Sequence, residues 1–275
     1  MNQTSYAEEP LQVEPLPLRL RRATSRVTRT LADAQDLSSK LAALRCIGGW
    51  ARGRIGRFGT VHEVTLRLHG LNLTVDTSRA ELIPYWEIWY ESTYDPMPGF
   101  CPVDAECVID VGAHIGAFTI HQALKKRAKR VIAFEPSPRV FRRLAANLEL
   151  NSLQNVQVIN VAVGDRCGDL PFLELPMSVN SRISDSGQRG AFFVGCVTLD
   201  SALKSFSIPR VSLIKIDTEG YEKRVLVGAS ETLQRTERLI IELHRESDKT
   251  ELEALLFAQG FRFIARKADV LFYSR

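Results

Sequence analysis

The chain has 275 residues, about twice the usual size of one domain, and a single large α/β domain with an extension would also account for this length. With 45% hydrophobic and 25% charged residues, the chain is neither disordered nor collagen-like, and it can bury a sizeable core. The net charge of +4 is too small to predict a nucleic-acid partner. The first 60 residues hold ten basic and five acidic side chains, so the positive surplus lies in that segment.

Targeting signals and disulfides are not expected. No apolar stretch approaches the roughly 18 residues that cross a bilayer, and the first ten residues lack the pattern of a signal peptide, which predicts a cytoplasmic protein. The five cysteines are odd in number and never form a Cys-x-x-Cys pair, which indicates reduced packing residues instead of disulfides or zinc ligands.

The N-terminal part divides into a tail and an extension. Residues 1–18 contain three prolines without a period, and this pattern predicts a mobile, dispensable tail. The arginine-rich segment 19–44 has helical character and is typical of a solvated basic helix, although peripheral contact with an anionic membrane is the alternative. The extension is expected to cover residues 19–106, and the ligand-binding domain residues 107–275.

Two further patterns lie within the extension. Apolar and polar residues alternate over 64–68 and 71–75 around His69 and Gly70, which predicts a β-hairpin. Residues 83–94 are rich in aromatic side chains. Their spacing favours a packed helix over a lid that covers a site.

From Cys107 onward, short apolar runs alternate with helical patterns. Such runs are typical of buried parallel strands, and Ser137 followed by Pro138 is a helix-start signal. The sequence therefore predicts an α/β fold with a doubly wound, mostly parallel sheet that ends in an antiparallel hairpin over 261–265 and 270–273. The five expected parallel strands cover residues 108–111, 130–134, 156–161, 213–216 and 239–241.

The first strand leads directly into a glycine-containing turn. Gly112, Ala113, His114 and Gly116 follow the strand, so a ligand can approach the backbone at the carboxyl edge of the sheet. A glycine pair alone is equally consistent with a tight structural turn. Asp110 precedes the glycines, where a carboxylate would repel a pyrophosphate and could hold the amine of a cationic ligand.

The next two strands supply further candidate contacts. Glu135 lies nineteen residues after Gly116 in the neighbouring turn, where a carboxylate can accept both ribose hydroxyls. After the third strand, Ala162 could flank an adenine ring and Asp165 could accept its exocyclic amine. Together these residues favour S-adenosylmethionine, which is positively charged and has no phosphates, over a dinucleotide.

The fourth strand completes a set of motifs that resembles the FkbM family of methyltransferases. The resemblance implies a class I S-adenosylmethionine (Rossmann-like) fold and methyl transfer to a hydroxyl of a sugar, glycolipid or polyketide-like acceptor. His114 stands where the family pattern has Asn. The matching segments cover about half of the chain and read VIDVGAHIGAFTI, VIAFEPSP, NVAVGD, TLDSAL, LIKIDTEGYEKRVLVGA and LIIELH.

Three residues are candidates for the chemistry. Asp217 and Glu219 follow the fourth strand and could bind the acceptor hydroxyl, position a divalent metal or stabilise the sulfonium, while pairing of Asp217 with Lys215 is the structural alternative. His244 shares one face of the fifth strand with Glu242, and its position at the carboxyl end favours a general base. The sequence leaves the metal, the acceptor and the oligomeric state open.

Two other functions compete with methyl transfer. An NAD(P)-dependent oxidoreductase could use the same type of sheet, but Asp110 and the absence of a Tyr-x-x-x-Lys segment disfavour it. A non-catalytic nucleotide-binding adaptor would bind the cofactor without turnover. If the protein is a methyltransferase, the polar stretch 180–182 is expected to line the acceptor pocket.

Overall fold

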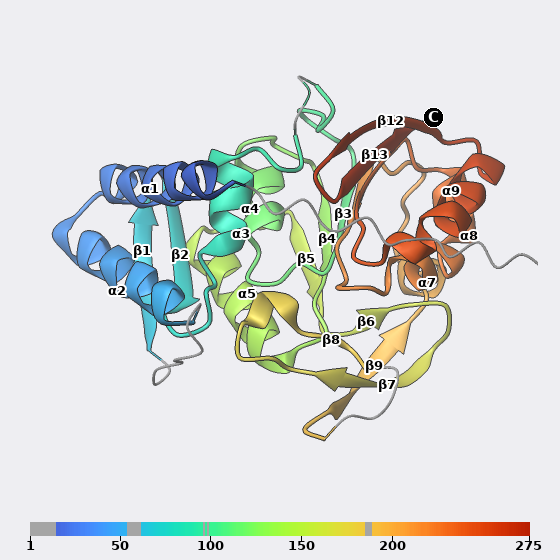
Figure 1. Ribbon diagram of the computed structural model, residues 1–275. Helices are drawn as coiled ribbons and strands as arrows, with labels where there is room; N and C mark the ends of the chain where they lie inside the picture. The colour runs from blue at the N-terminus through green and yellow to red at the C-terminus, as the bar shows by residue number, and fades with distance from the viewer. Residues whose placement is uncertain (1–14, 54–61, 96, 98, 185–188) are drawn as a thin grey trace, which may run out of the picture.

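The computed structural model describes residues 15–53, 62–95, 97, 99–184 and 189–275 (Figure 1). Most of the expected tail therefore lies outside the described residues. The three residues at its end do not belong to a tail, because helix α1 (Leu16–Asp33) begins at Leu16. Within the described ranges, no helix is both long and apolar enough to cross a membrane.

The N-terminal extension consists of two helices and a hairpin. The basic segment forms α1 and α2 (Leu37–Gly53), and the Asp36 carboxylate between them accepts a hydrogen bond from the Ser39 amide at 2.7 Å. The predicted hairpin is confirmed as β1 (Glu63–Leu68) and β2 (Leu71–Asp76), which pair in antiparallel register. Figure 1 shows both helices beside this hairpin at one end of the molecule.

The aromatic segment forms helix α3 (Ile83–Tyr85) and a short π-helix, η1 (Trp86–Tyr90). Trp86 is fully buried, and its indole N–H donates to the Thr30 hydroxyl of α1 at 2.9 Å. The Arg26 guanidinium of α1 also forms a bidentate interaction with the Glu91 carboxylate. The expected packed helix is therefore present over residues 83–90, and Arg26 of the basic segment binds its C-terminal end.

The central sheet contains all five predicted parallel strands and the predicted C-terminal hairpin. The strand order β12-β13-β11-β10-β3-β4-β5 places β3 in the middle, with β10 and β11 on one side of it and β4 and β5 on the other. β13 runs antiparallel to both of its neighbours. The strands are β3 (Val108–Val111), β4 (Val131–Phe134), β5 (Val156–Ile159), β10 (Leu213–Ile216), β11 (Arg238–Glu242), β12 (Arg262–Lys267) and β13 (Val270–Ser274).

Helices cover both faces of this sheet because successive strand residues point in opposite directions. Ile109 and Ile214 pack with one set of helices, and Val108 and Leu213 pack with residues of the other face. The Ser137 hydroxyl caps α5 by accepting the Val140 amide at 3.2 Å, as predicted. The helices are α4 (Ala117–Leu124), α5 (Pro138–Leu150), α6 (Leu199–Leu203), α7 (Glu222–Val227), α8 (Ser230–Gln234) and α9 (Lys249–Ala258).

A second sheet was not predicted. It has the order β6-β9-β7-β8 and lies in the chain between β5 and α6, where no strand was predicted after residue 161. Its strands bury only alternate residues or are two residues long, so they lack the continuous apolar runs of the central sheet. These strands are β6 (Ala162–Val163), β7 (Gly168–Leu173), β8 (Arg182–Ile183) and β9 (Phe192–Val197).

Candidate active site

A cavity of about 300 Å³ opens at the carboxyl ends of the central strands. By strand order, the glycine turn after β3 and Glu135 after β4 line one side of it (the glycine-turn end), and Asp217 and Glu219 after β10 and Glu242 of β11 line the other (the carboxylate end). The two sides meet where Gly112 packs against the Asp217 backbone. The expected acceptor-pocket residues 180–182 also line it, from the second sheet. Other lining residues come from α3 and η1, so the aromatic segment both packs and covers the cavity: Ile83, Pro84, Glu87 and Ile88.

The glycine turn brings the backbone close to the ligand space. Gly112 has a φ of 81°, and a Cβ at this position would lie 1.8 Å from the Asp217 carbonyl oxygen, so only glycine fits. Gly112 and Ala113 line the cavity as expected. Gly116 does not. It precedes α4 with a φ of 93°, and a Cβ there would meet the Leu144 side chain, so its role is in packing.

Glu135 lies in the cavity wall, where the sequence placed it. One carboxylate oxygen accepts the His114 amide and the other accepts the Ser137 amide, both at 2.9 Å. Burial raises the pKa of Glu135 to about 7, against the lowering effect of these two hydrogen bonds. The carboxylate therefore fixes the glycine turn as well as facing the cavity.

Asp110 does not line the cavity, so its predicted contact with the ligand amine is not supported. Its side chain is fully buried, and it accepts a hydrogen bond from the Thr119 hydroxyl at 2.6 Å. The other oxygen lies 3.4 Å from the Lys215 Nζ, which donates to the Gly112 carbonyl at 2.9 Å. Asp110 thus provides the charged partner that the buried Lys215 ammonium needs, while Lys215 binds the glycine turn.

Only one of the two candidates after the third strand faces the cavity. Ala162 lines it between Val161 and Val163. Asp165 points elsewhere, and its carboxylate binds the Arg224 guanidinium at 2.8 Å. The predicted contact of Asp165 with adenine is therefore not supported, because Arg224 on the distant helix α7 provides a charged partner that the spacing did not reveal.

His114 lines the cavity with a half-buried, neutral imidazole. Its Nε2 lies 2.9 Å from the Ser178 hydroxyl, and its backbone has a φ of 52°. Burial lowers the pKa of His114 to about 3. The side chain therefore carries no charge at neutral pH, as the family's Asn would carry none.

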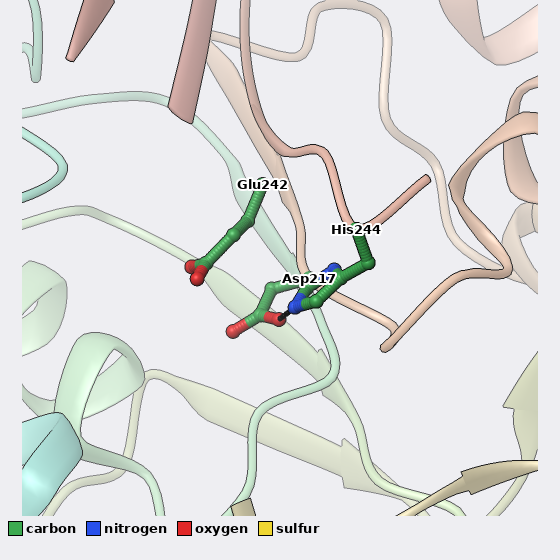
Figure 2. Close-up of side chains that lie close together, drawn as sticks. All are labelled: Asp217, Glu242 and His244. Carbon is green, nitrogen blue, oxygen red and sulfur yellow. Dashed lines mark ion pairs between the residues drawn. The ribbon is translucent and has the colours of Figure 1, made fainter. Parts of the chain in front are cut away.

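At the other end of the cavity, His244 lies among carboxylates (Figure 2). Its Nε2 is 3.9 Å from Asp217 Oδ1 and 3.5 Å from Glu219 Oε1, and its Nδ1 is 3.0 Å from Glu222 Oε1. Asp217 and His244 follow the parallel strands β10 and β11, which are adjacent in the sheet. His244 itself is not among the residues that line the cavity.

The charge around His244 contradicts its predicted role as a general base. Burial opposes protonation, but hydrogen bonds with Glu219 and Glu222 and the charge of Asp217 outweigh it and raise the pKa of His244 to about 11. The imidazole is therefore protonated at neutral pH and cannot accept another proton.

Asp217 combines the functional and the structural alternatives. It pairs with the Lys215 Nζ at 3.2 Å, and despite burial the charge of Lys215 lowers its pKa. The Tyr94 hydroxyl lies 3.2 Å from Asp217 and forms a short hydrogen bond to Glu242. Burial and the charge of Asp217 raise the pKa of Glu242 to about 7.

The sequence analysis did not assign Tyr94, Glu87 or Glu242 to the site. Partial burial and the charges of Glu242 and Asp217 raise the pKa of Glu87 to about 8. The alternation of Glu242 with His244 was a usable signal, because both side chains had to share one face of the strand. Glu87 and Tyr94 had none, since they come from a segment far away in the sequence.

Residues 110–263, more than half of the chain, match the family model described as the Methyltransferase FkbM domain. The chain belongs to this family. It is 29% identical over 147 residues to the hexuronic acid methyltransferase AglP of Haloferax volcanii, covering 54% of this chain and 59% of that protein. It is 27% identical over 202 residues to the 31-O-demethyl-FK506 methyltransferase FkbM of Streptomyces tacrolimicus, covering 61% and 76%. The match to the first relative thus spans about three fifths of that protein.

Solved structures agree with the family in fold. The METTL16 MTase domain superposes with a TM-score of 0.50 and 14% identity, covering 92% of this chain and 89% of that one. Methyltransferase FkbM from Methylobacillus flagellatus KT has a TM-score of 0.48 and 16% identity, covering 94% and 60%. Together with the strand order, the METTL16 superposition confirms the expected class I methyltransferase fold.

Proposed function

We propose that this FkbM-family protein transfers a methyl group from S-adenosylmethionine to a hydroxyl of a sugar, glycolipid or polyketide-like acceptor. One observation carries the proposal: a single cavity joins the glycine turn and Glu135 to the carboxylates of Asp217, Glu219 and Glu242. The name of one relative supports an oxygen acceptor, because it gives 31-O-demethyl-FK506 as the molecule methylated. The name of another gives a hexuronic acid, which supports a sugar acceptor.

The residues at the glycine-turn end fit the cofactor. Glu135 can accept hydrogen bonds from the ribose hydroxyls, and Gly112 and Ala113 line the same cavity. Ala162 offers an apolar surface for adenine. Bound there, S-adenosylmethionine would supply an electrophilic methyl carbon. The acceptor oxygen would attack it as the carbon–sulfur bond breaks, S-adenosylhomocysteine would leave, and the ionised Asp217 carboxylate can accept the hydroxyl proton.

The carboxylate end fits the acceptor and the sulfonium charge. Asp217 is ionised and held by Lys215, so it can stabilise a positive sulfonium or align the acceptor hydroxyl. Glu219 lies two residues after Asp217, and His244 follows the adjacent strand β11. Their side chains are 3.5 Å apart and orient each other. We assign Asp217 and Glu219 to the acceptor site, with His244 as the cation that keeps both carboxylates in place.

The charge of the cavity disfavours the oxidoreductase alternative. Its lining contains five acidic side chains and only two cationic ones, so it offers few positive charges to the pyrophosphate of a dinucleotide. The cationic residues are Lys215 and Arg182, and the acidic ones are Glu87, Glu135, Asp217, Glu219 and Glu242.

The start of α1 supports the proposed peripheral membrane contact. Leu16, Leu18 and Leu20 are half or more exposed, and the exposed Arg21 lies beside them on the same helix. An amphipathic basic helix of this kind binds anionic lipid surfaces. Co-sedimentation with phosphatidylserine vesicles tests this contact, and Leu16→Ser with Leu20→Ser should abolish it.

Methyl transfer is tested with methyl-labelled S-adenosylmethionine and a panel of glycans, glycolipids and small hydroxylated metabolites. The expected result is label in one acceptor class, with mass detection of one added methyl group. The adaptor alternative predicts cofactor binding without transfer to any acceptor. Tight binding of NAD in place of S-adenosylmethionine would contradict the proposal.

A further inference from the structure

Three side chains at the carboxylate end place possible metal-ligand atoms close together. Asp217, Glu242 and His244 each offer one ligand atom, and these atoms all lie within 4.8 Å of one another (Figure 2). Asp217 follows β10, whereas Glu242 ends β11 and His244 comes two residues later. Two adjacent strands of the rigid central sheet therefore fix the geometry of the set.

The spacing within the set leaves room for an ion. The 3.9 Å between Asp217 Oδ1 and His244 Nε2 is too long for a hydrogen bond. It is shorter than two metal–ligand bonds of about 2.1 Å placed end to end, so one ion can bind both atoms. Glu219 Oε1, 3.5 Å from the same nitrogen, lies within reach of that ion as well.

Supporting contacts orient the three ligands independently of their own cluster. The His244 Nδ1 lies 3.0 Å from the buried Glu222 carboxylate, which also accepts the Gly220 amide at 2.9 Å. A carboxylate on the second ring nitrogen is the usual support of a metal-binding histidine, because it directs the other nitrogen to the ion. The Tyr94 hydroxyl contacts both Glu242 and Asp217 and holds the two carboxylates together.

The choice of ligand atoms indicates the type of cation. Two carboxylates and one imidazole suit a hard divalent ion such as Mn²⁺ or Mg²⁺, which keeps further positions for oxygen ligands. The surplus of carboxylates around the cavity favours a cation at this end. A bound ion would replace the proton on His244 Nε2, because a metal-binding imidazole must be neutral.

We propose that Asp217, Glu242 and His244 form a binding site for one Mn²⁺ or Mg²⁺ ion at the acceptor end of the cavity. Its open positions suit the oxygen atoms of a hydroxylated acceptor, and this second part rests on the proposed function. The cation site itself does not depend on methyl transfer, so it can be tested without the acceptor.

Electron paramagnetic resonance of Mn²⁺ tests the site directly, with the metal-free full-length protein titrated at neutral pH. The expected result is one bound Mn²⁺ per chain, competed by Mg²⁺. Glu242→Gln and His244→Gln are nearly isosteric, and each should weaken Mn²⁺ binding at least tenfold. Asp165→Asn is the matched control, because it removes a carboxylate that lies outside the cavity, and it should bind Mn²⁺ like the wild type.

Three results would overturn the site: no stoichiometric Mn²⁺ binding by the wild type, unchanged binding in both variants, or loss in only one of them. Circular dichroism must show that each variant is folded, and the isosteric His244→Asn serves if His244→Gln is not. Transfer of labelled methyl groups without Mn²⁺ binding would reject the cation site and keep the proposed function. Mn²⁺ binding without transfer to any acceptor would keep the cation site and reject the proposed function.

Discussion

The two ends of the cavity are built on different principles. The glycine-turn end comes mainly from consecutive residues after β3 and β4, with backbone atoms and one carboxylate facing the ligand space. The carboxylate end brings together η1, β10 and β11, with charged side chains that fix one another. A local backbone shape can be predicted from a short motif, whereas a charge network depends on segments that only the fold brings together.

Two histidines show the same contrast. His114 is neutral because burial lowers its pKa to about 3, and its Nε2 lies 2.9 Å from the uncharged Ser178 hydroxyl. His244 is protonated because its carboxylate neighbours raise its pKa to about 11. His114 is therefore an uncharged lining residue and His244 a cation. The difference comes from the groups around each ring.

The largest expected effect comes from the carboxylate end. Asp217→Asn removes the charge that faces the acceptor and should lower turnover by about 10² to 10⁴. The affinity for S-adenosylmethionine should stay nearly intact, because Glu135 and the glycine turn are unchanged. Steady-state kinetics and calorimetry measure the two quantities. Full turnover by the folded variant would show that Asp217 only holds Lys215 in place.

The cofactor end should respond in affinity. Glu135→Ala should weaken S-adenosylmethionine binding by about 1 to 3 kcal/mol, the range for a charged hydrogen-bond partner. Since the pKa of Glu135 is about 7 in the free protein, wild-type affinity should fall as the pH is lowered through 7, where the carboxylate becomes protonated. Calorimetry from pH 6 to 8 checks both effects, and a pH-independent affinity in the wild type would exclude Glu135 as an ionised ligand.

The two histidines should give opposite pH dependences of stability, measured by denaturant unfolding with a chelator present. The folded pKa of His244 is raised above its ordinary value of 6.5, so its stabilisation is complete below pH 6.5 and is lost as the pH rises toward 11. The folded pKa of His114 is depressed, so its contribution is present above pH 6.5 and is lost as the pH falls toward 3.

Single substitutions separate these two contributions. His244→Gln should flatten the loss of stability on the alkaline side, and His114→Asn should flatten it on the acid side. An unchanged alkaline slope in His244→Gln would contradict the assignment of its charge to the network with Glu219 and Glu222.

The smallest effect is expected at Asp165. Asp165→Ala breaks a partly exposed pair with Arg224 and should cost less than about 1 kcal/mol of stability. Cofactor affinity should not change, because the side chain does not line the cavity. A loss of affinity comparable to that of Glu135→Ala would restore the sequence-based prediction of an adenine contact.

The sequence predicted the central sheet because its buried strands are continuous apolar runs, and it placed Gly112, Ala113 and Glu135 correctly because short motifs join them to strand ends. It misplaced Asp110 and Asp165 because their partners, Lys215 and Arg224, are distant in sequence. The protonation of His244 was likewise hidden, since it depends on three carboxylates brought near the ring by the fold.

The central claim is that one cavity binds S-adenosylmethionine with its ribose at Glu135 and its methyl group facing Asp217. A crystal structure of the complex with S-adenosylhomocysteine tests it most directly. The account predicts both ribose hydroxyls within hydrogen-bond distance of the Glu135 carboxylate and the sulfur directed toward Asp217 and Glu242. A nucleoside bound outside this cavity, or bound with the ribose at the carboxylate end, would contradict it.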